Sequence, residues 1–122
     1  CNWYQLPMGD AVRALFGEHE HRFGVHGGDI ETSIMLAIAP HLVRMQHAQQ
    51  FASTSEQRAR NTRVLGNGVS AKLAWQAQDL NPSGAVGNAA AASAAKGQAV
   101  LNAVAQSLAE LIQDIADLEP LA

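Results

Sequence analysis

The last third of the chain carries the pattern that most restricts its fold. Apolar side chains recur there at helical spacing and polar side chains fill the opposite side; the apolar positions are Val100, Leu101, Val104, Leu108, Leu111, Ile112, Ile115 and Leu118. The preceding stretch AAAASAAKG extends the pattern, because alanine is the best helix former. We therefore expect one long amphipathic helix from about residue 88 to about residue 118.

Size and charge narrow the functional classes. The 122 residues suit one domain or part of one, and 8 Lys and Arg against 11 Asp and Glu give a net charge of −3. A surface that binds nucleic acid needs an excess of basic residues, so we expect no nucleic-acid partner. No apolar run approaches the ~20 residues that span a bilayer, so we expect no membrane partner either.

The beginning of the chain is unusual. It starts with Cys1 instead of Met and continues directly into the apolar stretch NWYQLP. We expect truncation or processing of a longer protein in preference to a lipid-bearing first residue, because no polar tether follows. Cys1 is also the one cysteine of the chain, and since it cannot form an internal disulfide we expect a reducing, cytoplasmic location.

Local patterns predict the other elements. Residues 29–39 are apolar on nearly every face after Ser33 and stop at Pro40, which predicts a helix buried on all sides. Residues 18–28 have no apolar period and predict a loop. The remaining expectations are a strand at 2–6, a short helix at 10–16, a strand at 41–45, a loop or exposed helix at 46–63, and a strand at 72–80 whose pattern alone also fits a helix.

Three motifs of known chemistry are incomplete. Residues 68–72 (GVSAK) lack the closing glycine of a nucleophile elbow, which argues against a serine hydrolase. Residues 66–71 loosely match a dinucleotide-binding turn, but no acidic residue follows about 20 positions later, so we interpret them as a turn. In an extended segment His19 and His21 could share a metal, although a charged, solvated loop is the favoured interpretation.

The stretch GVHGGDIETS, residues 24–33, has the most coherent polar pattern. Two glycines before a helix let the backbone approach a ligand, and the helix N-terminus presents free N–H groups. His26 lies just outside that terminus, where an imidazole can give or accept a proton. Glu31 is flanked by apolar residues on a helix expected to be buried, where a carboxylate needs a charged partner, a metal or a proton.

Simpler roles are available for these residues. Capping of the first-turn amides is favoured for Asp29, Thr32 and Ser33. From the residues alone, a cap or an ion pair is also favoured for Glu31, and an ordinary surface or core position is favoured for His26. A catalytic interpretation of the last two residues therefore needs further support.

Two segments resemble the creatininase (creatinine amidohydrolase) family. HGGDIETSIMLAIAPHLVRM is similar to the family's signature of His-Ala/Gly-Gly, Glu-Thr-Ser, an apolar helix and Pro-x-Leu-Val. NPSGAVGNAAAASAAKG resembles, more weakly, the family's Ser-Gly-x-x-Gly-Asp-Pro segment followed by Ala-Thr-x-Glu-Lys-Gly. Together with NWY near the start, the similarity covers nearly the whole chain in the family's order.

The resemblance implies a fold and an activity. The family consists of metal-dependent hydrolases of cyclic amides and related C–N bonds, with a three-layer α/β/α fold and commonly a homo-oligomeric assembly, so the chain is expected to be α/β. By this resemblance Zn and/or Mn would activate water against a small-molecule cyclic amide. His26 matches the proton shuttle, Trp3 matches an aromatic residue of the substrate pocket, and Glu31 lies close to the metal centre as a ligand or an orienting group. From the residues alone, an ordinary core position is favoured for Trp3.

The departures from the family limit what this chain can do alone. The family's principal metal ligands come from a Glu-x-His-Gly segment, a following Asp and an Asn-Gly-His strand end, and none of these is in the chain. We therefore expect residues 1–122 to be the C-terminal half of a single domain, inactive in isolation. Arg22 stands where creatininase has a tryptophan, which argues against creatinine as substrate. The alternative is a non-catalytic remnant or assembly module that oligomerises through its C-terminal helix.

Overall fold

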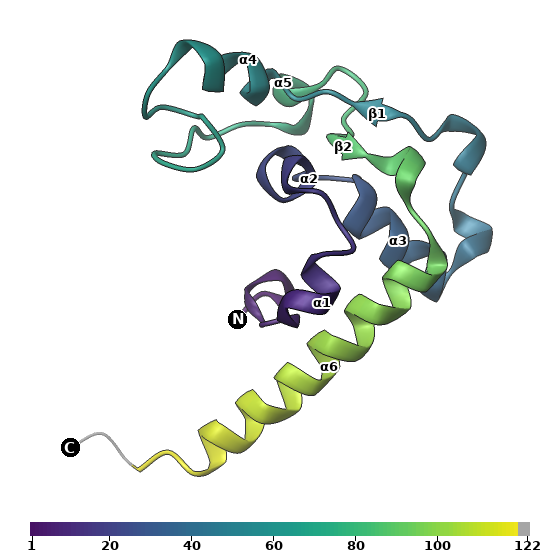
Figure 1. Ribbon diagram of the computed structural model, residues 1–122, viewed down its shortest axis with the longest axis vertical. Helices are drawn as coiled ribbons and strands as arrows, with labels where there is room; N and C mark the ends of the chain where they lie inside the picture. The colour runs from purple at the N-terminus through teal and green to yellow at the C-terminus, as the bar shows by residue number, and fades with distance from the viewer. Residues whose placement is uncertain (120–122) are drawn as a thin grey trace.

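The computed structural model describes residues 1–119 and is rich in helix with little sheet (Figure 1). With η denoting a short 3-10 helix, its elements in chain order are η1 (Trp3–Gln5), α1 (Gly9–Arg13), α2 (Glu18–Phe23), α3 (Asp29–Ile38), η2 (Pro40–Leu42), η3 (Met45–His47), β1 (Gln50–Phe51), α4 (Thr54–Asn61), α5 (Ala77–Leu80), β2 (Gly87–Asn88), η4 (Ala89–Ala91) and α6 (Ala94–Ala116). No helix within residues 1–119 combines the length and the apolar character needed to cross a membrane.

The small sheet joins two distant parts of the chain. β1 pairs with β2 in antiparallel orientation, with Gln50 opposite Asn88 and Phe51 opposite Gly87. Just before β2, Val86 forms an isolated antiparallel bridge with His26. Within residues 1–119 the sheet expected of an α/β fold is therefore limited to this pair and this bridge.

Three expected strands are wrong. Residues 2–6 contain η1, residues 41–45 lie across η2 and η3, and residues 72–80 end in α5. Side chains close the first and the last of these turns: the N–H group of Asn2 donates to Gln5 Oε1 at 3.0 Å, and that of Gln76 donates to Asp79 Oδ2 at 2.8 Å. Local bonds of this kind offer the backbone an alternative to strand pairing.

The expected loop at 18–28 is also wrong, because it begins with α2. Glu20 and Phe23 are both buried, since a spacing of three residues places them on one face of the helix. Phe16, just before the helix, is buried too. The sequence shows no apolar period here because one of the inward-facing side chains, that of Glu20, is a carboxylate.

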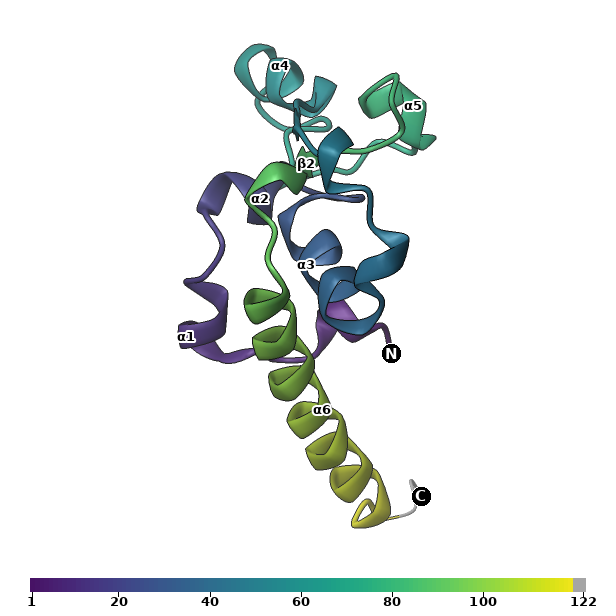
Figure 2. The ribbon, with the colours of Figure 1, turned by 90° about the vertical axis from the view of Figure 1, so that its right-hand side faces the viewer.

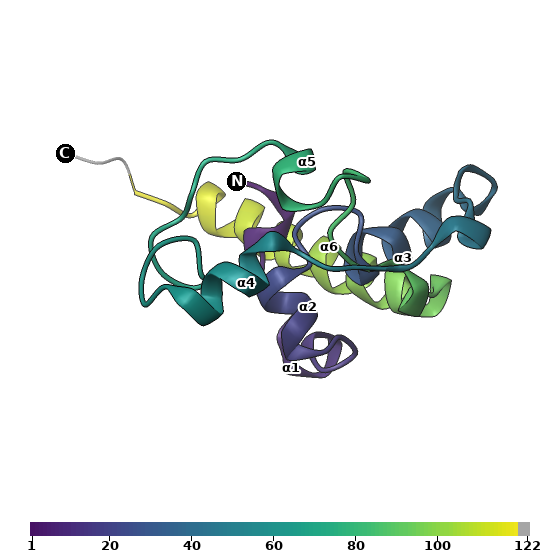
Figure 3. The same ribbon diagram turned by 90° about the horizontal axis from the view of Figure 1, so that it is seen from above.

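α3 and α6 cross at the centre of the structure, where they lie side by side (Figures 2 and 3). Gly97 permits their close approach: a Cβ at this position would lie 1.9 Å from the backbone oxygen of Ser33. Val100 is fully buried beside it. Lys96 Nζ lies 2.5 Å from Asp29 Oδ2, and both side chains are largely buried. We call this contact the α3–α6 crossing.

The long C-terminal helix is confirmed, but it begins at Ala94 and not near residue 88. Ser93 is its N-cap, and the side-chain oxygen of Ser93 accepts from Lys96 N at 3.3 Å. The preceding alanines form η4, where the N–H group of Ala90 donates to the carbonyl of Gln49 at 3.3 Å. This tertiary contact overrides the helix propensity of alanine.

The second half of α6 extends away from the other elements (Figures 1 and 2). Leu108, Ile112 and Ile115 are 42%, 60% and 62% exposed. Residues 108–116 are called the distal half of α6 below. Leu118, which was expected to continue the helix, follows its end.

The helix expected at 29–39 is confirmed as α3, but it is not buried on all sides. Its buried residues are Asp29 and Ser33, which face the crossing. Met35 and Ile38 are 40% and 60% exposed. A helix that is buried on all sides needs neighbours on every face. Within residues 1–119 the main neighbour of α3 is α6, which covers the face of Asp29 and Ser33.

Candidate functional site

His26 lies in the loop between α2 and α3, with its backbone fixed and its ring accessible. The N–H group of Val86 donates to the His26 carbonyl at 2.6 Å, and the N–H group of His26 donates to the Val86 carbonyl at 3.3 Å. Gly27 follows with φ of 65°, a left-handed conformation that turns the chain into the helix and favours glycine. The imidazole is 59% exposed, so the simpler core interpretation of His26 does not apply.

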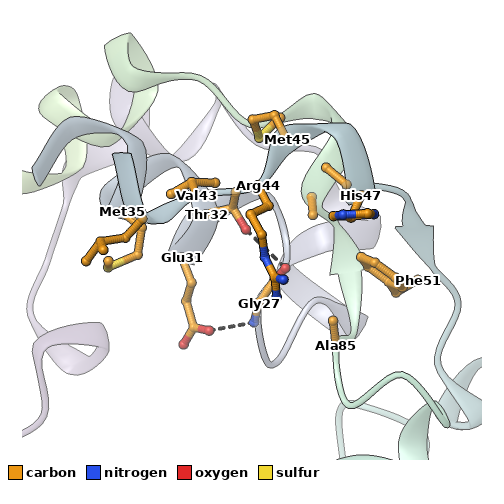
Figure 4. Close-up of a pocket in the computed structure, with 13 residues that line it drawn as sticks. Gly27, Glu31, Thr32, Met35, Val43, Arg44, Met45, His47, Phe51 and Ala85 are labelled. Atoms are coloured by element: carbon orange, nitrogen blue, oxygen red, sulfur yellow. Dashed lines mark hydrogen bonds between the residues drawn. The ribbon is translucent and has the colours of Figure 1, made fainter. Parts of the chain in front are cut away.

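Glu31 faces the same turn from the beginning of α3 (Figure 4). Its Oε2 accepts a hydrogen bond from Gly27 N at 2.6 Å and lies 3.7 Å from His26 Nδ1. The second contact becomes an ion pair when the imidazole is protonated. The carboxylate therefore binds a backbone N–H group that precedes the helix, and it can pair with a protonated His26; the side chain is 43% exposed and not buried as expected.

Asp29, Thr32 and Ser33 do not cap the first-turn amides as expected. The Asp29 carboxylate binds Lys96 Nζ, and Ser33 Oγ donates to Asp29 Oδ1 at 3.1 Å. Thr32 Oγ1 donates to the carbonyl of Gly27 at 3.1 Å. The Asp29 carboxylate is instead occupied by a charge-assisted hydrogen bond from a lysine far along the chain.

Glu20 caps α3 in their place, and the sequence did not reveal it. Its Oε1 accepts from Asp29 N at 2.6 Å, its Oε2 accepts from Asn88 N at 2.8 Å, and the residue is 5% exposed. The available signal was the spacing of three residues to Phe23, which places the two side chains on one helix face.

Two hollows meet at Glu31. One has a volume of about 440 Å³ and is mainly apolar, with walls that include Trp3, Glu31, Leu101 and Val104. The other, of about 430 Å³, has a more polar wall that includes Glu31, Arg44 and His47 (Figure 4). Glu31 and Met35 border both hollows, whereas His26 borders neither of the two. Glu31 thus shares a hollow with Trp3 and lies 3.7 Å from His26.

The described residues do not form a complete metal site by themselves. Within residues 1–119, no three His, Cys, Asp or Glu side chains gather so that they could hold an ion. His26 and Glu31 supply two neighbouring donors, whereas protein zinc sites use at least three. His19 and His21 contact different partners, since His19 Nε2 lies 3.2 Å from Glu56 Oε2 and a ring nitrogen of His21 lies 2.9 Å from the carbonyl of Arg13.

The segment 66–71 is a turn, as expected. Asn67 Oδ1 accepts from the N–H groups of Val69 and Ser70 at 2.9 and 2.8 Å. The guanidinium of Arg22 donates twice to the Asn67 carbonyl, at 3.1 and 2.9 Å, and lies 4.8 Å from the centre of the Phe23 ring. Arg22 therefore attaches this turn to α2.

Comparison with known proteins agrees with the resemblance seen in the sequence. Residues 1–112 match the creatininase family, described as creatinine amidohydrolase. The chain is also similar to a crystal structure from Bacteroides fragilis described as a "putative creatinine amidohydrolase", with 23% identity and a TM-score of 0.69. The match covers 100% of this chain and 44% of that one, so the chain spans less than half of that protein's length. No curated protein matches. The structural likeness shows the fold, and on the family match the chain belongs to the creatininase family.

Proposed function

We propose that this chain forms one wall of the active site of a metal-dependent amidohydrolase that cleaves a cyclic amide or a related C–N bond. One observation carries the proposal: in a chain of the creatininase family, the exposed imidazole of His26 lies 3.7 Å from the Glu31 carboxylate beside a helix N-terminus. Trp3 borders a hollow of about 440 Å³ that also reaches Glu31, which is room for a small-molecule substrate.

In this proposal His26 moves the proton that amide hydrolysis requires. The leaving nitrogen must receive a proton as the C–N bond breaks, and an imidazole can take that proton from the attacking water and pass it on. Glu31 Oε2, at 3.7 Å, stabilises the ring while it carries the proton. The hydrogen bond from Gly27 N to the same oxygen, at 2.6 Å, holds the carboxylate in place.

The metal and the assembly are the parts of the proposal that rest on the family resemblance. Bound Zn or Mn would supply activated water. The resemblance assigns the principal ligands to an N-terminal Glu-x-His-Gly segment and an Asn-Gly-His strand end, with Glu31 close by as a ligand or an orienting group. A complete three-layer α/β/α domain, a homo-oligomer and a cytoplasmic location belong to the same proposal.

The substrate is proposed to be a cyclic amide other than creatinine. Creatininase has a tryptophan four residues before the histidine, where this chain has Arg22. The Arg22 guanidinium is engaged by the Asn67 carbonyl and the Phe23 ring, so it does not replace an apolar wall of a substrate pocket.

The test replaces His26 by Ala in the full-length protein that carries this chain. We expect kcat for the best substrate of a cyclic-amide panel to fall about 100-fold or more, because a general acid-base group contributes on that order. Metal content, measured by elemental analysis, should stay unchanged. His41→Ala, at an exposed position in η2, is the matched control and should keep its turnover. Unchanged turnover in His26→Ala contradicts the proposed role.

A second candidate is a non-catalytic assembly module. The observation in its favour is the exposure of Leu108, Ile112 and Ile115 on one side of the distal half of α6, since such apolar surfaces mark contact sites. Turnover and assembly separate the two candidates. The module is supported if the metal-bound protein hydrolyses no member of the panel and Ile112→Asp disrupts its oligomer in sedimentation. The same result contradicts the proposed enzyme.

A further inference from the structure

Glu20 is a buried carboxylate that the proposed chemistry does not use. It is 5% exposed, and among residues 1–119 no Lys, Arg or His lies within ion-pair distance of it. A buried charge without a cation needs hydrogen bonds to remain stable. The ones that Glu20 receives come from backbone groups of two other elements.

Each oxygen of Glu20 holds a different segment. Oε1 accepts from Asp29 N, the first residue of α3, at 2.6 Å. Oε2 accepts from Asn88 N, in β2, at 2.8 Å. The carboxylate therefore ties α2, the N-terminus of α3 and β2 together.

The surrounding backbone is shaped to admit this side chain. Gly24, Gly28 and Gly87 surround the carboxylate, and a Cβ at these positions would lie 2.3, 2.1 and 2.8 Å from Glu20 Oε1. At such distances a Cβ could enter only if the Glu20 carboxylate moved away. Two glycines of the α2–α3 loop and one of β2 thus leave the space that one carboxylate fills.

His26 lies between the two segments that Glu20 holds. The loop that carries it ends at Asp29, and its backbone pairs with Val86, which precedes β2 by one residue. The His26 backbone thus has two supports, the end of its loop at Asp29 and the segment 86–88 with which it pairs. The Glu20 carboxylate holds both of them.

We infer that Glu20 is a positioning residue that sets the place of His26 through the backbone of residues 24–29 and 86–88. This inference rests on the proposed function for its effect on turnover, and on the geometry alone for its effect on the loop. A side chain that offers one acceptor oxygen in place of two would release one of the two supports. Glu20→Gln makes that change, because the amide NH₂ group of glutamine cannot accept from a backbone N–H. The substitution leaves the shape of the side chain almost unchanged.

The experiment compares Glu20→Gln with Glu18→Gln in the full-length protein. Glu18 is on the same helix and its side chain is 87% exposed, so it controls for loss of an acidic group from α2. The first measurement is amide hydrogen exchange. In Glu20→Gln we expect exchange at His26, Val86 and Asn88 to accelerate about 10-fold or more, while Val100, in the crossing, stays protected. Accelerated exchange at Val100 as well would show general destabilisation and overturn the inference.

The second measurement is turnover per folded molecule. We expect kcat of Glu20→Gln to fall about 10- to 100-fold with little change in KM, because a misplaced reacting group loses rate at this scale. Glu18→Gln should match the unsubstituted protein in both measurements. Local loosening with unchanged kcat, or no local loosening, overturns the inference. If the unsubstituted protein turns over nothing, the proposed function fails, and exchange alone decides whether Glu20 positions His26.

Discussion

The part of α6 at the α3–α6 crossing and the distal half of α6 belong to one continuous helix with one apolar repeat, yet their environments differ. At the crossing Gly97 and Val100 are buried, and Lys96 is held by Asp29. In the distal half Ile112 and Ile115 are at least 60% exposed. The repeat alone does not tell the two halves apart. A small residue and a charge with a partner on α3 determine which turns are covered.

Among the substitutions that test this difference, Gly97→Ala is expected to lower the stability of the protein most. The added Cβ would lie 1.9 Å from the Ser33 backbone oxygen, so the two helices must separate. Alanine gains up to about 1 kcal/mol of helix propensity over glycine, whereas overpacking typically costs about 1–3 kcal/mol and is expected at the upper end against a backbone oxygen this close. We expect the overpacking to dominate and the free energy of unfolding, measured by urea denaturation, to fall by at least about 2 kcal/mol.

Gly17→Ala is the matched control for this change. A Cβ at Gly17 meets no atom within 4 Å, and the residue is the N-cap of α2. Because glycine is preferred over alanine at an N-cap, its substitution should cost up to about 1 kcal/mol, still well below the cost at Gly97. Equal effects of the two substitutions would mean that the close approach at Gly97 does not hold the crossing together.

A somewhat smaller effect is expected from Lys96→Met. This change keeps most of the side-chain volume but leaves the Asp29 carboxylate, whose side chain is 6% exposed, without its cation. Removing one partner of a largely buried pair costs about 3 kcal/mol, reduced here because Lys96 itself is 22% exposed. Lys72→Met, at an exposed position, is the control, and thermal denaturation of both variants checks the difference. A Tm equal to that of the control would contradict a stabilising ion pair.

The smallest effect is expected from Ile112→Ala in the distal half. Ile112 is 60% exposed, so its truncation removes little buried apolar surface. The free energy of unfolding should therefore change by about 0.5 kcal/mol or less. Val100→Ala, in a fully buried residue, should cost about 2 kcal/mol by comparison. Urea denaturation of this pair sharpens the contrast between the halves of α6. A cost of 2 kcal/mol at Ile112 would instead show that a partner covers the distal half in solution.

The sequence predicted best the elements with long periodic patterns. α3 and α6 were expected from apolar spacing, whereas the site roles of His26 and Glu31 came from the family resemblance, and the burial expected for Glu31 is absent. The sequence placed the start of α6 too early. The N–H group of Ala90 donates to the Gln49 carbonyl, and no local pattern indicates this tertiary contact. Short elements such as η1 were missed because one side-chain bond decides them.

Glu20 could not be assigned a structural role from the sequence because its partners are remote. Asn88 follows it by 68 residues, and its own neighbours are charged or histidine. In a local reading such a glutamate belongs to a solvated loop. Only the tertiary fold shows that its carboxylate replaces Asp29, Thr32 and Ser33 as the cap of α3.

The glycines around Glu20 also make substitutions in this region depend on one another. Every atom that a Cβ at Gly24 would meet most closely belongs to the Glu20 carboxyl group. Gly24→Ala is therefore expected to be costly beside Glu20 and much less costly in a chain that already carries Glu20→Ala, so the two costs are not additive. The order in which such changes arise would then decide which are tolerated: a side chain could enter position 24 only after the glutamate has gone.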